Sequence, residues 1–369
     1  MNVQGQSCRT IWLEPDGRTV GIIDQLALPH EMRIASLHSL ADMEEAIRAM
    51  RVRGAPLIGA AAAYGLALAM HEDAGDAGVA RAVDRLLRTR PTAVNLQWAL
   101  TRAAAALRST RPEERADAAY RIAARICDED VEINRRIGAH GLKLIREIAG
   151  RKPGEPVQVL THCNAGWLAT VDWGTALSPV YHAVREAIPI HVWVAETRPR
   201  LQGALTSWEL TQEHVPHTII VDSAAAHLMQ RRRVDLVITG ADRVTALGDV
   251  ANKVGTYMKA LAARDNDVPF YAAVPTPSID FAMQDGIAST PIEERSTREL
   301  TWMRGTTADG RTLEVRVLPA AASALNVAFD VTPARLVTGL ITEHGVVPAD
   351  PQGLAGLART IEAAAGADR

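Results

Sequence analysis

Apolar side chains recur every three or four residues along the first part of the chain. In residues 39–50 they alternate with charged residues at the spacing of an amphipathic helix. The segment 57–70 is almost wholly apolar and rich in alanine, but its length of about 14 residues is short of the ~20 that cross a bilayer, so it predicts a buried helix. The same analysis predicts helices over 77–89, 94–108, 113–127 and 129–149, preceded by a small strand pair within the first 30 residues.

Short apolar runs alternate with helical segments in the second half of the chain. This alternation is typical of β-α-β units and predicts a parallel, doubly wound sheet. Residues 151–156, RKPGEP, concentrate helix breakers and charge between the two halves. The sequence therefore predicts an α/β chain with a mainly helical domain over 1–150 and a domain with a mostly parallel sheet over 151–369. The runs expected as strands are 157–163, 190–196, 217–222, 234–242 and 270–275.

Ligands of such sheets bind outside the carboxyl ends of the strands, which directs attention to the last residue of each run. Cys163, in THCNAG, ends the first run. It is interpreted either as an activated thiol at the mouth of the sheet or as a small buried apolar side chain. Asp242, in TGADR, acts as a general acid if burial raises its pKa. Its alternatives are a helix cap or an ion pair with Arg243. Glu196 and Asp222 end two further runs.

Two arginines stand just before predicted helix starts. Arg53, Gly54 and Ala55 lead into Pro56 and the alanine-rich segment, and proline suits the first helical turn. Free N–H groups at a helix N-terminus together with a guanidinium form a site for a phosphate. The alternative is a tight glycine turn with a solvated arginine. Arg90 repeats the arrangement before the segment AVNLQWAL.

Other motifs indicate little. Asn252 and Lys253 open a predicted helix, where they bind substrate oxygens or are merely solvated. His214 and His217 are separated by a proline and have no carboxylate that completes a ligand set, so no metal site is predicted. The chain has no G-x-G-x-x-G after a strand, no Walker A sequence and no G-x-S-x-G. A cofactor therefore has no support.

Composition narrows the class of protein. The formal net charge of −3 over 369 residues argues against binding nucleic acid through bulk positive charge, and a small-molecule partner is favoured. Three widely spaced cysteines without a C-x-x-C fit a reducing, cytoplasmic environment. The first residues are too polar for a signal peptide, and no segment predicts a membrane span.

Six segments, read together, resemble the methylthioribose-1-phosphate isomerases of methionine salvage. The resemblance is in order, covers most of residues 20–345 and includes a later FDVTP. It implies a helical N-terminal domain, a Rossmann-like C-terminal domain, a cytoplasmic homodimer and no cofactor. The segments are VRGAPLIGAAAAYG (52–65), RPTAVNLQWAL (90–100), LTHCNAGWLATVDWGTAL (160–177), ETRPRLQGALTSWEL (196–210), TGADRVTALGDVANKVGTY (239–257) and PIEER (291–295).

The resemblance also implies an activity and the residues that perform it. The activity is an aldose–ketose isomerisation of 5-methylthioribose 1-phosphate to 5-methylthioribulose 1-phosphate. The family's catalytic cysteine and aspartate fall on Cys163 and Asp242. Its substrate-binding residues fall on Arg53, Gly54, Ala55, Arg90, Gln202, Asn252 and Lys253.

Some positions depart from the family pattern and leave alternatives open. QGALTSWEL is one residue shorter than the usual segment and lacks its arginine, and bulky Trp167 lies close to the cysteine in the sequence. Sister isomerases acting on 5-deoxyribose 1-phosphate or ribose 1,5-bisphosphate therefore remain possible, although a second phosphate needs a second cationic site. The architecture also resembles non-enzymatic regulatory subunits of the translation-initiation nucleotide-exchange factor.

Overall fold

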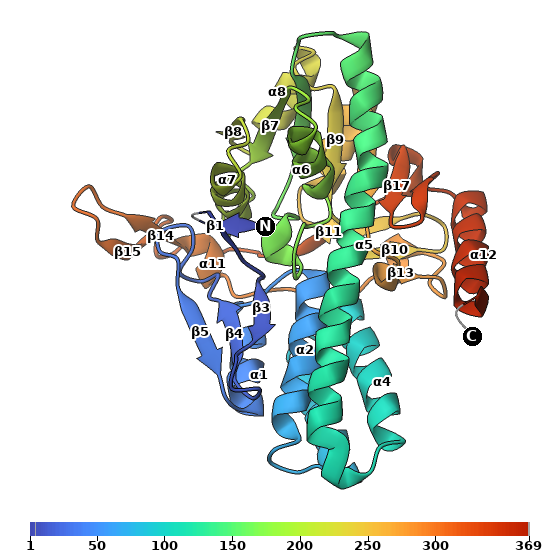
Figure 1. The fold of residues 1–369 in the computed structure, drawn as a ribbon. Coiled ribbons are helices and arrows are strands. Elements are labelled where there is room, and N and C mark those ends of the chain that lie inside the picture. The colour runs from blue at the N-terminus through green and yellow to red at the C-terminus, as the bar shows by residue number, and fades with distance from the viewer. Residues whose placement is uncertain (4, 368–369) are drawn as a thin grey trace.

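Small antiparallel strands precede the helices in the computed structural model, which describes residues 1–3 and 5–367 (Figure 1). The expected strand pair is part of a larger arrangement. β3 and β4 pair as an antiparallel ribbon, and β5, which lies beyond residue 30, adds a third strand. The strands are β1 (Asn2–Val3), β2 (Gln6–Ser7), β3 (Ile11–Leu13), β4 (Val20–Ile23) and β5 (Ile34–Leu37).

Five helices follow, close to their predicted positions. Ser39 caps the first of them by accepting from the Asp42 N–H, and the Asp42 carboxylate accepts from the Ser39 N–H in return. The predicted helices over 113–127 and 129–149 are one continuous helix, because no glycine or proline separates them. The helices are α1 (Leu40–Arg48), α2 (Ala55–Ala69), α3 (Asp76–Leu87), α4 (Val94–Arg108) and α5 (Arg115–Arg151).

A seven-stranded sheet forms the second half and confirms the predicted α/β class. Its order is β18-β17-β12-β9-β6-β7-β8, and every pair is parallel except β17 with β18. The chain order reverses between β6 and β9, so the switch point of the sheet lies there. The strands are β6 (Val157–Thr161), β7 (Ile190–Ala195), β8 (His217–Ile220), β9 (Leu236–Thr239), β12 (Phe270–Ala273), β17 (Gly339–Thr342) and β18 (Gly345–Val347).

Helices cover both faces of this sheet. Alternate residues of β6 point to opposite sides: Val157 and Val159 belong to the apolar cluster that includes α5, α6 and α7, whereas Leu160 belongs to the cluster that includes α8, α9 and α12. Successive side chains of a strand point to opposite faces, and here both faces are buried. The predicted runs are therefore continuously apolar. The helices are α6 (Ser178–Arg185), α7 (Gln202–Gln212), α8 (Ala224–Gln230), α9 (Thr256–Asp265) and α12 (Pro351–Ala367).

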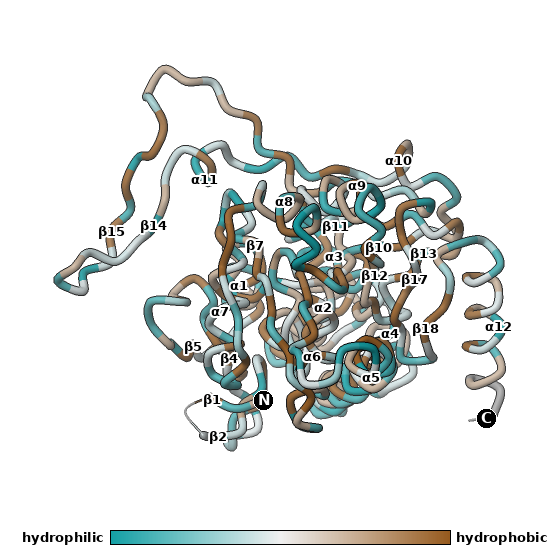
Figure 2. The backbone as a smooth tube through the Cα atoms, turned by 90° about the horizontal axis from the view of Figure 1, so that it is seen from above, coloured by the Kyte–Doolittle hydropathy of each residue, from teal (hydrophilic) through white to brown (hydrophobic). Residues whose placement is uncertain are grey.

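A second, four-stranded sheet and a hairpin complete the chain. The sheet has the order β13-β10-β11-β16. The β14–β15 hairpin projects from the body of the molecule, on the side away from α12 (Figure 2). These elements are β10 (Arg243–Thr245), β11 (Val250–Lys253), β13 (Ile279–Asp280), α10 (Gly286–Ser289), α11 (Arg298–Thr301), β14 (Trp302–Thr306), β15 (Thr312–Arg316) and β16 (Phe329–Thr332). No helix within 1–3 and 5–367 is long and apolar enough to cross a membrane.

Helix α5 joins the two halves of the molecule (Figure 1). Its N-terminal part, including Ala123 and Ile126, packs in the helical core, whereas Ile137 and Ile145 pack against the sheet. The helix ends at Arg151, where the breaker segment begins. The division into domains over 1–150 and 151–369 stays a prediction.

Glycines allow α5 and α6 to approach closely. A Cβ atom on Gly138 would lie 2.1 Å from Oγ of Ser178 and 2.4 Å from Cδ2 of His182. Gly150, in the same helix, has no other atom within 4 Å of its ideal Cβ position. A side chain therefore has space at Gly150, near the end of the helix, but not at Gly138.

We predict that Gly138→Ala lowers the free energy of unfolding by about 1–3 kcal/mol, the usual cost of overpacking. Gly150→Ala is the matched control and should raise it by up to ~1 kcal/mol, because alanine is the better helix former. Urea unfolding followed by circular dichroism measures both. Equal effects of the two substitutions would contradict close helix packing at Gly138.

Candidate active site

The nine residues that the family resemblance assigns to the site all line one cavity at the switch point of the sheet, whereas the strand-end residues Glu196 and Asp222 do not line it. The cavity lies between the N-terminus of α2, the loops after β6 and β9, and strand β11. This arrangement brings together side chains that are far apart in the sequence. The predicted residues in its wall are Arg53, Gly54, Ala55, Arg90, Cys163, Gln202, Asp242, Asn252 and Lys253.

The backbone at the start of α2, next to Arg53, lies very close to the backbone of Ala169. Gly54 has φ +95°, and a Cβ atom there would lie 2.4 Å from the carbonyl oxygen of Ala169, so glycine is required. The side chain of Arg53 donates from Nη1 to the Asn164 carbonyl at 3.1 Å. Its Nε and Nη2 atoms are buried and find no hydrogen-bond partner among the described residues. Arg53 is only 9% exposed, so the interpretation as a solvated arginine is wrong.

Cys163 lies in the loop after β6 and reaches the cavity. Its backbone has the left-handed φ of +65°, and the residue is partly exposed. Burial raises the pKa of the thiol, while the positive charges of Arg53 and Lys253 act in the opposite direction. The thiol is therefore protonated at neutral pH unless a bound substrate changes its surroundings.

Asp242 follows β9 on the other side of the switch point. Its N–H donates to the Ala251 carbonyl at 2.9 Å, which fixes the backbone beside β11. Burial raises the pKa of the carboxyl group, and the charges of Arg90 and Lys253 partly offset this. The alternative of an ion pair with Arg243 is wrong, because that arginine pairs with Asp280 at 3.5 Å.

Polar groups from α7 and β11 complete the wall between the thiol and the carboxyl group. Oε1 of Gln202, at the start of α7, is buried and accepts no hydrogen bond from the described residues. Nδ2 of Asn252 donates to Oγ1 of Thr256 at 3.0 Å. Lys253 is buried, and burial lowers the pKa of its ammonium group. Asn252 and Lys253 are thus in the cavity, and they end β11 instead of opening a helix.

Arg90 differs from Arg53 because its charge is already paired. Its Nη2 donates to Glu293 at 2.9 Å. Arg295 donates to both Glu293 and Glu299, and Arg200 also donates to Glu299. Burial opposes ionisation of Glu299, but the hydrogen bonds and charges of Arg295 and Arg200 lower its pKa to about 2. The sequence analysis missed Arg200 and Arg295 as cavity residues.

Comparisons with known proteins agree with this geometry. A family model described as the initiation factor 2 subunit family matches residues 51–349. The chain is 59% identical over 359 residues to the methylthioribose-1-phosphate isomerase of Brucella anthropi, covering 97% of this chain and 99% of the relative. The corresponding isomerase of Rhizobium meliloti is 58% identical over 359 residues and is covered to the same extent.

The chain belongs to the methylthioribose-1-phosphate isomerase family. Solved structures of two similar proteins agree with its fold. The crystal structure of 5-methylthioribose 1-phosphate isomerase from Pyrococcus horikoshii is 39% identical, with a TM-score of 0.82, covering 96% of this chain and 97% of that one. A structure described as translation initiation factor eIF-2B, subunit delta, from A. fulgidus is 38% identical, with a TM-score of 0.77, covering 95% and 100%.

A buried carboxylate that the sequence analysis missed supports the thiol loop of this family member. Glu209, in α7, accepts from the N–H groups of Trp167 and Leu168 at 2.9 Å, from Nδ2 of Asn164 at 2.8 Å and from the hydroxyl of Tyr181 at 2.9 Å. Burial raises its pKa to about 7, although these hydrogen bonds favour the ionised form. Glu209 therefore fixes the backbone that follows Cys163. In the sequence, only its place among the buried positions of α7 could have indicated this role.

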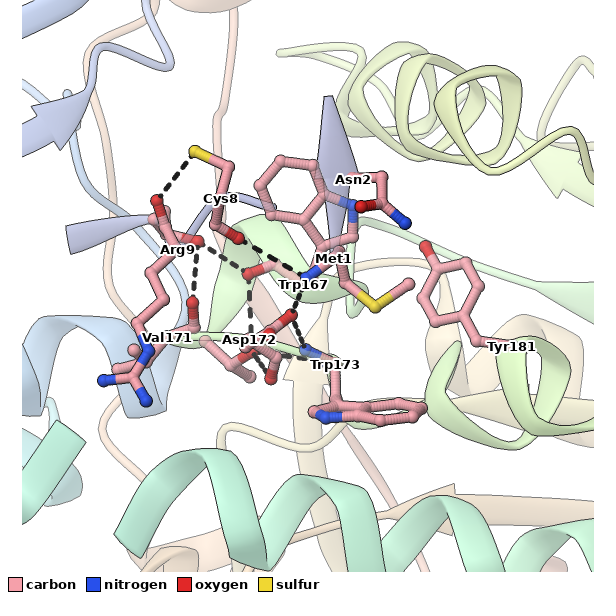
Figure 3. A network of polar contacts seen from close by, with 12 residues as sticks. Met1, Asn2, Cys8, Arg9, Trp167, Val171, Asp172, Trp173 and Tyr181 are labelled. Carbon is pink, nitrogen blue, oxygen red and sulfur yellow. Dashed lines mark hydrogen bonds and ion pairs between the residues drawn. The ribbon is translucent and has the colours of Figure 1, made fainter. Parts of the chain in front are cut away.

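The tryptophans of this loop lie in the core. Trp167 is fully buried and is not part of the cavity wall, so its bulk does not reach the thiol. Figure 3 shows the surrounding contacts, in which the Met1 ammonium group lies 2.7 Å from Oδ1 of Asp172. The Trp173 N–H donates to the same carboxylate oxygen at 2.7 Å. These contacts attach the N-terminal ribbon to the loop behind the active site.

The cavity offers charged and polar groups instead of a metal ligand set. Within residues 1–3 and 5–367, no group of three or more His, Cys, Asp or Glu side chains is placed to hold a metal ion. The expectation that the family member uses neither metal nor cofactor stays a prediction.

We predict that Lys253→Met raises the pKa of Cys163 further, because it removes a positive charge that stabilises the thiolate. The thiolate is the reactive form, so alkylation of Cys163 by iodoacetamide should slow at neutral pH, and its pH midpoint should move upward. Mass spectrometry of the Cys163 peptide measures the rate. Lys143→Met, at an exposed position of α5, is the control. An unchanged profile in Lys253→Met would contradict this electrostatic coupling.

Proposed function

We propose that this protein converts 5-methylthioribose 1-phosphate into 5-methylthioribulose 1-phosphate, a step of methionine salvage. The observation that carries the proposal is the cavity itself. Its wall combines a guanidinium group that has two unpaired, buried nitrogen atoms with a thiol and a carboxyl group, both of raised pKa. The names of the similar proteins support the same reaction.

The phosphate is held at the start of α2. Nε and Nη2 of Arg53 are donors without protein partners, and they lie beside the free N–H groups of the first helical turn. Burying a cation without a partner is costly, so an anion in this position stabilises the site. Gly54 and Ala55, which also line the cavity, leave room for the phosphate oxygens, and Arg90 adds a second guanidinium group to the same cavity.

Asp242 supplies the acid for ring opening. A sugar with phosphate on its anomeric carbon cannot open as a free hemiacetal does, so the ring oxygen needs a proton. The raised pKa of Asp242 favours the protonated carboxyl group that can donate it. As the bond between C1 and the ring oxygen breaks, the oxygen keeps the bonding electrons and becomes the C4 hydroxyl. C1 is left electron-deficient.

Hydrogen then moves from C2 to C1 at the face occupied by Cys163, and two routes balance. In the first, the thiolate of Cys163 takes the C2 proton and an enol phosphate forms; the thiol then returns a proton to C1 while the C2 hydroxyl loses its proton to give the ketone. In the second, hydrogen moves from C2 to C1 as a hydride while Cys163 stabilises the developing charge, and the C2 hydroxyl loses its proton to give the ketone. The raised pKa of the Cys163 thiol disfavours the first route. Gln202, Asn252 and Lys253 orient the sugar oxygens.

The charge distribution favours a substrate with one phosphate over ribose 1,5-bisphosphate. Arg200 and Arg295 are paired with Glu299, and Arg90 is paired with Glu293. Arg53 is the one among these four arginines without a carboxylate partner, and we therefore take it as the phosphate-binding arginine. A methyl group in place of methylthio, as in 5-deoxyribose 1-phosphate, changes no charge and is the closer alternative.

The setting of the reaction is also part of the proposal. We expect a homodimer that works in the cytoplasm, as the family resemblance implies and as the three free cysteines allow. Sedimentation of the purified protein tests the dimer. The proposed partner is a small sugar phosphate, with no nucleic acid or membrane.

We predict that the purified protein turns over 5-methylthioribose 1-phosphate faster than 5-deoxyribose 1-phosphate or ribose 1,5-bisphosphate. Phosphorus NMR follows the conversion of an anomeric phosphate into a primary phosphate ester. A folded protein that converts none of the three would overturn the enzymatic function and favour a regulatory role like that of the exchange-factor subunits.

We predict that Asp242→Asn and Cys163→Ser each lower kcat at least 10²-fold, because each removes a group that acts on the reacting atoms. Arg53→Met should instead act mainly on KM through the lost phosphate contact. The same NMR assay at varied substrate concentration separates these effects. Near-full activity of Asp242→Asn or Cys163→Ser would refute the assigned role of that residue.

Turnover in D2O distinguishes the two routes for hydrogen. We expect little deuterium at C1 of the product, because the protonated thiol favours the hydride route. Proton NMR of the product measures it. Full incorporation of one deuterium at C1 would show that Cys163 acts as a base.

A further inference from the structure

Two neighbouring strands of the main sheet end in left-handed residues that are not glycine. Cys163, after β6, has φ +65°, and Thr197, after β7, has φ +61°. This conformation is unfavourable for any side chain with a Cβ atom, and for a β-branched residue such as threonine it is rare. Such residues persist only where the surrounding structure holds them, and they cluster at active sites.

A direct hydrogen bond joins the two strained residues. The backbone N–H of Cys163 donates to Oγ1 of Thr197 at 2.8 Å. Thr197 is fully buried and does not line the cavity, so its hydroxyl group is not available to a substrate. The hydrogen bond therefore affects the cavity by fixing the backbone of Cys163, from which the thiol projects.

Asp222, after β8, holds Thr197 in turn. Its Oδ1 accepts the N–H of Thr197 at 3.0 Å, and its Oδ2 accepts the N–H of Arg198 at 2.8 Å. Nζ of Lys259, which is almost completely buried, lies 3.6 Å from Oδ1 of Asp222 and forms an ion pair with it. Both carboxylate oxygens are thus used to fix the backbone that carries Thr197.

His162 sets the direction of the Thr197 hydroxyl group. Burial lowers the pKa of His162 to about 3, so its ring is neutral. Its Nε2 lies 2.9 Å from the Val254 carbonyl oxygen and donates to it, which leaves Nδ1 as an acceptor 3.1 Å from Oγ1 of Thr197. The hydroxyl donates to Nδ1 or to the Ala195 carbonyl at 3.0 Å, and its lone pair accepts from Cys163.

We propose that Thr197 and Asp222 are positioning residues, which hold Cys163 in its left-handed conformation so that the thiol faces the substrate opposite Asp242. This inference rests on the proposed isomerase function. Neither residue touches the substrate, and both act through the backbone at the end of β6. Their loss should therefore impair the step at C1 and C2 more than it impairs binding.

The test compares Thr197→Val, Thr197→Ser and Thr332→Val in the phosphorus NMR assay. Valine keeps the shape of threonine but removes Oγ1, so kcat should fall about 10²-fold while KM changes less than about twofold, as expected for a displaced catalytic group. Serine restores the acceptor, and Thr197→Ser should recover kcat to within about fivefold. Thr332 is equally buried, and its Oγ1 finds no partner among the described residues, so Thr332→Val should keep kcat within about twofold.

Each other result has a definite meaning. Unchanged kcat in Thr197→Val, a change in KM alone, or an equal loss in Thr332→Val would overturn the proposal.

If circular dichroism shows that Thr197→Val does not fold, the Asp222→Asn variant tests the proposal, because asparagine can accept only one of the two N–H groups. A kcat about tenfold lower then supports the proposal, and an unchanged kcat overturns it. Absence of turnover in the unaltered protein contradicts the proposed function itself and is thereby distinguished from failure of this inference.

Discussion

The burial of the Arg53 guanidinium against the loop after β6 is the contact on which the active-site cavity depends. It attaches the N-terminus of α2 to the carboxyl edge of the parallel sheet through a hydrogen bond to Asn164. Gly54 makes this possible, because any Cβ atom would collide with the backbone at Ala169. The helical half and the sheet half thus meet where the chain order of the sheet reverses, and long helix α5 holds them together behind that contact.

The electrostatic balance of the cavity follows from this burial. Arg53 has two donors without protein partners, whereas Arg90, Arg200 and Arg295 share the two carboxylates of Glu293 and Glu299. A buried, unpaired cation is costly in the free protein, so the cost is relieved when an anion binds. The same low-polarity surroundings raise the pKa of both Cys163 and Asp242. Burial in the cavity therefore favours both the binding of a phosphate at Arg53 and the protonated form of Asp242.

Much of the fold was predictable because local rules decide it. Helical spacing of apolar residues located α1 and α4, and Pro56 in the first turn marked the start of α2. The split of α5 was predicted wrongly, because a change in its buried face between the two cores resembled a break in the pattern. The expected strand pair is incomplete because its third strand, β5, lies beyond residue 30, after a turn that separates it from β4.

Spacing, capping and turn preferences act over a few neighbouring residues, so the amino-acid sequence alone specifies which residue types stand at the strand ends and helix starts. Cys163, Asp242 and Arg53 could be located in this way. The partners of those side chains depend on the tertiary packing. Arg90 pairs with Glu293 across 203 positions, and Cys163 depends on Thr197 across 34. Such partners are chosen by the packing of distant segments, which leaves no periodic signal in the sequence.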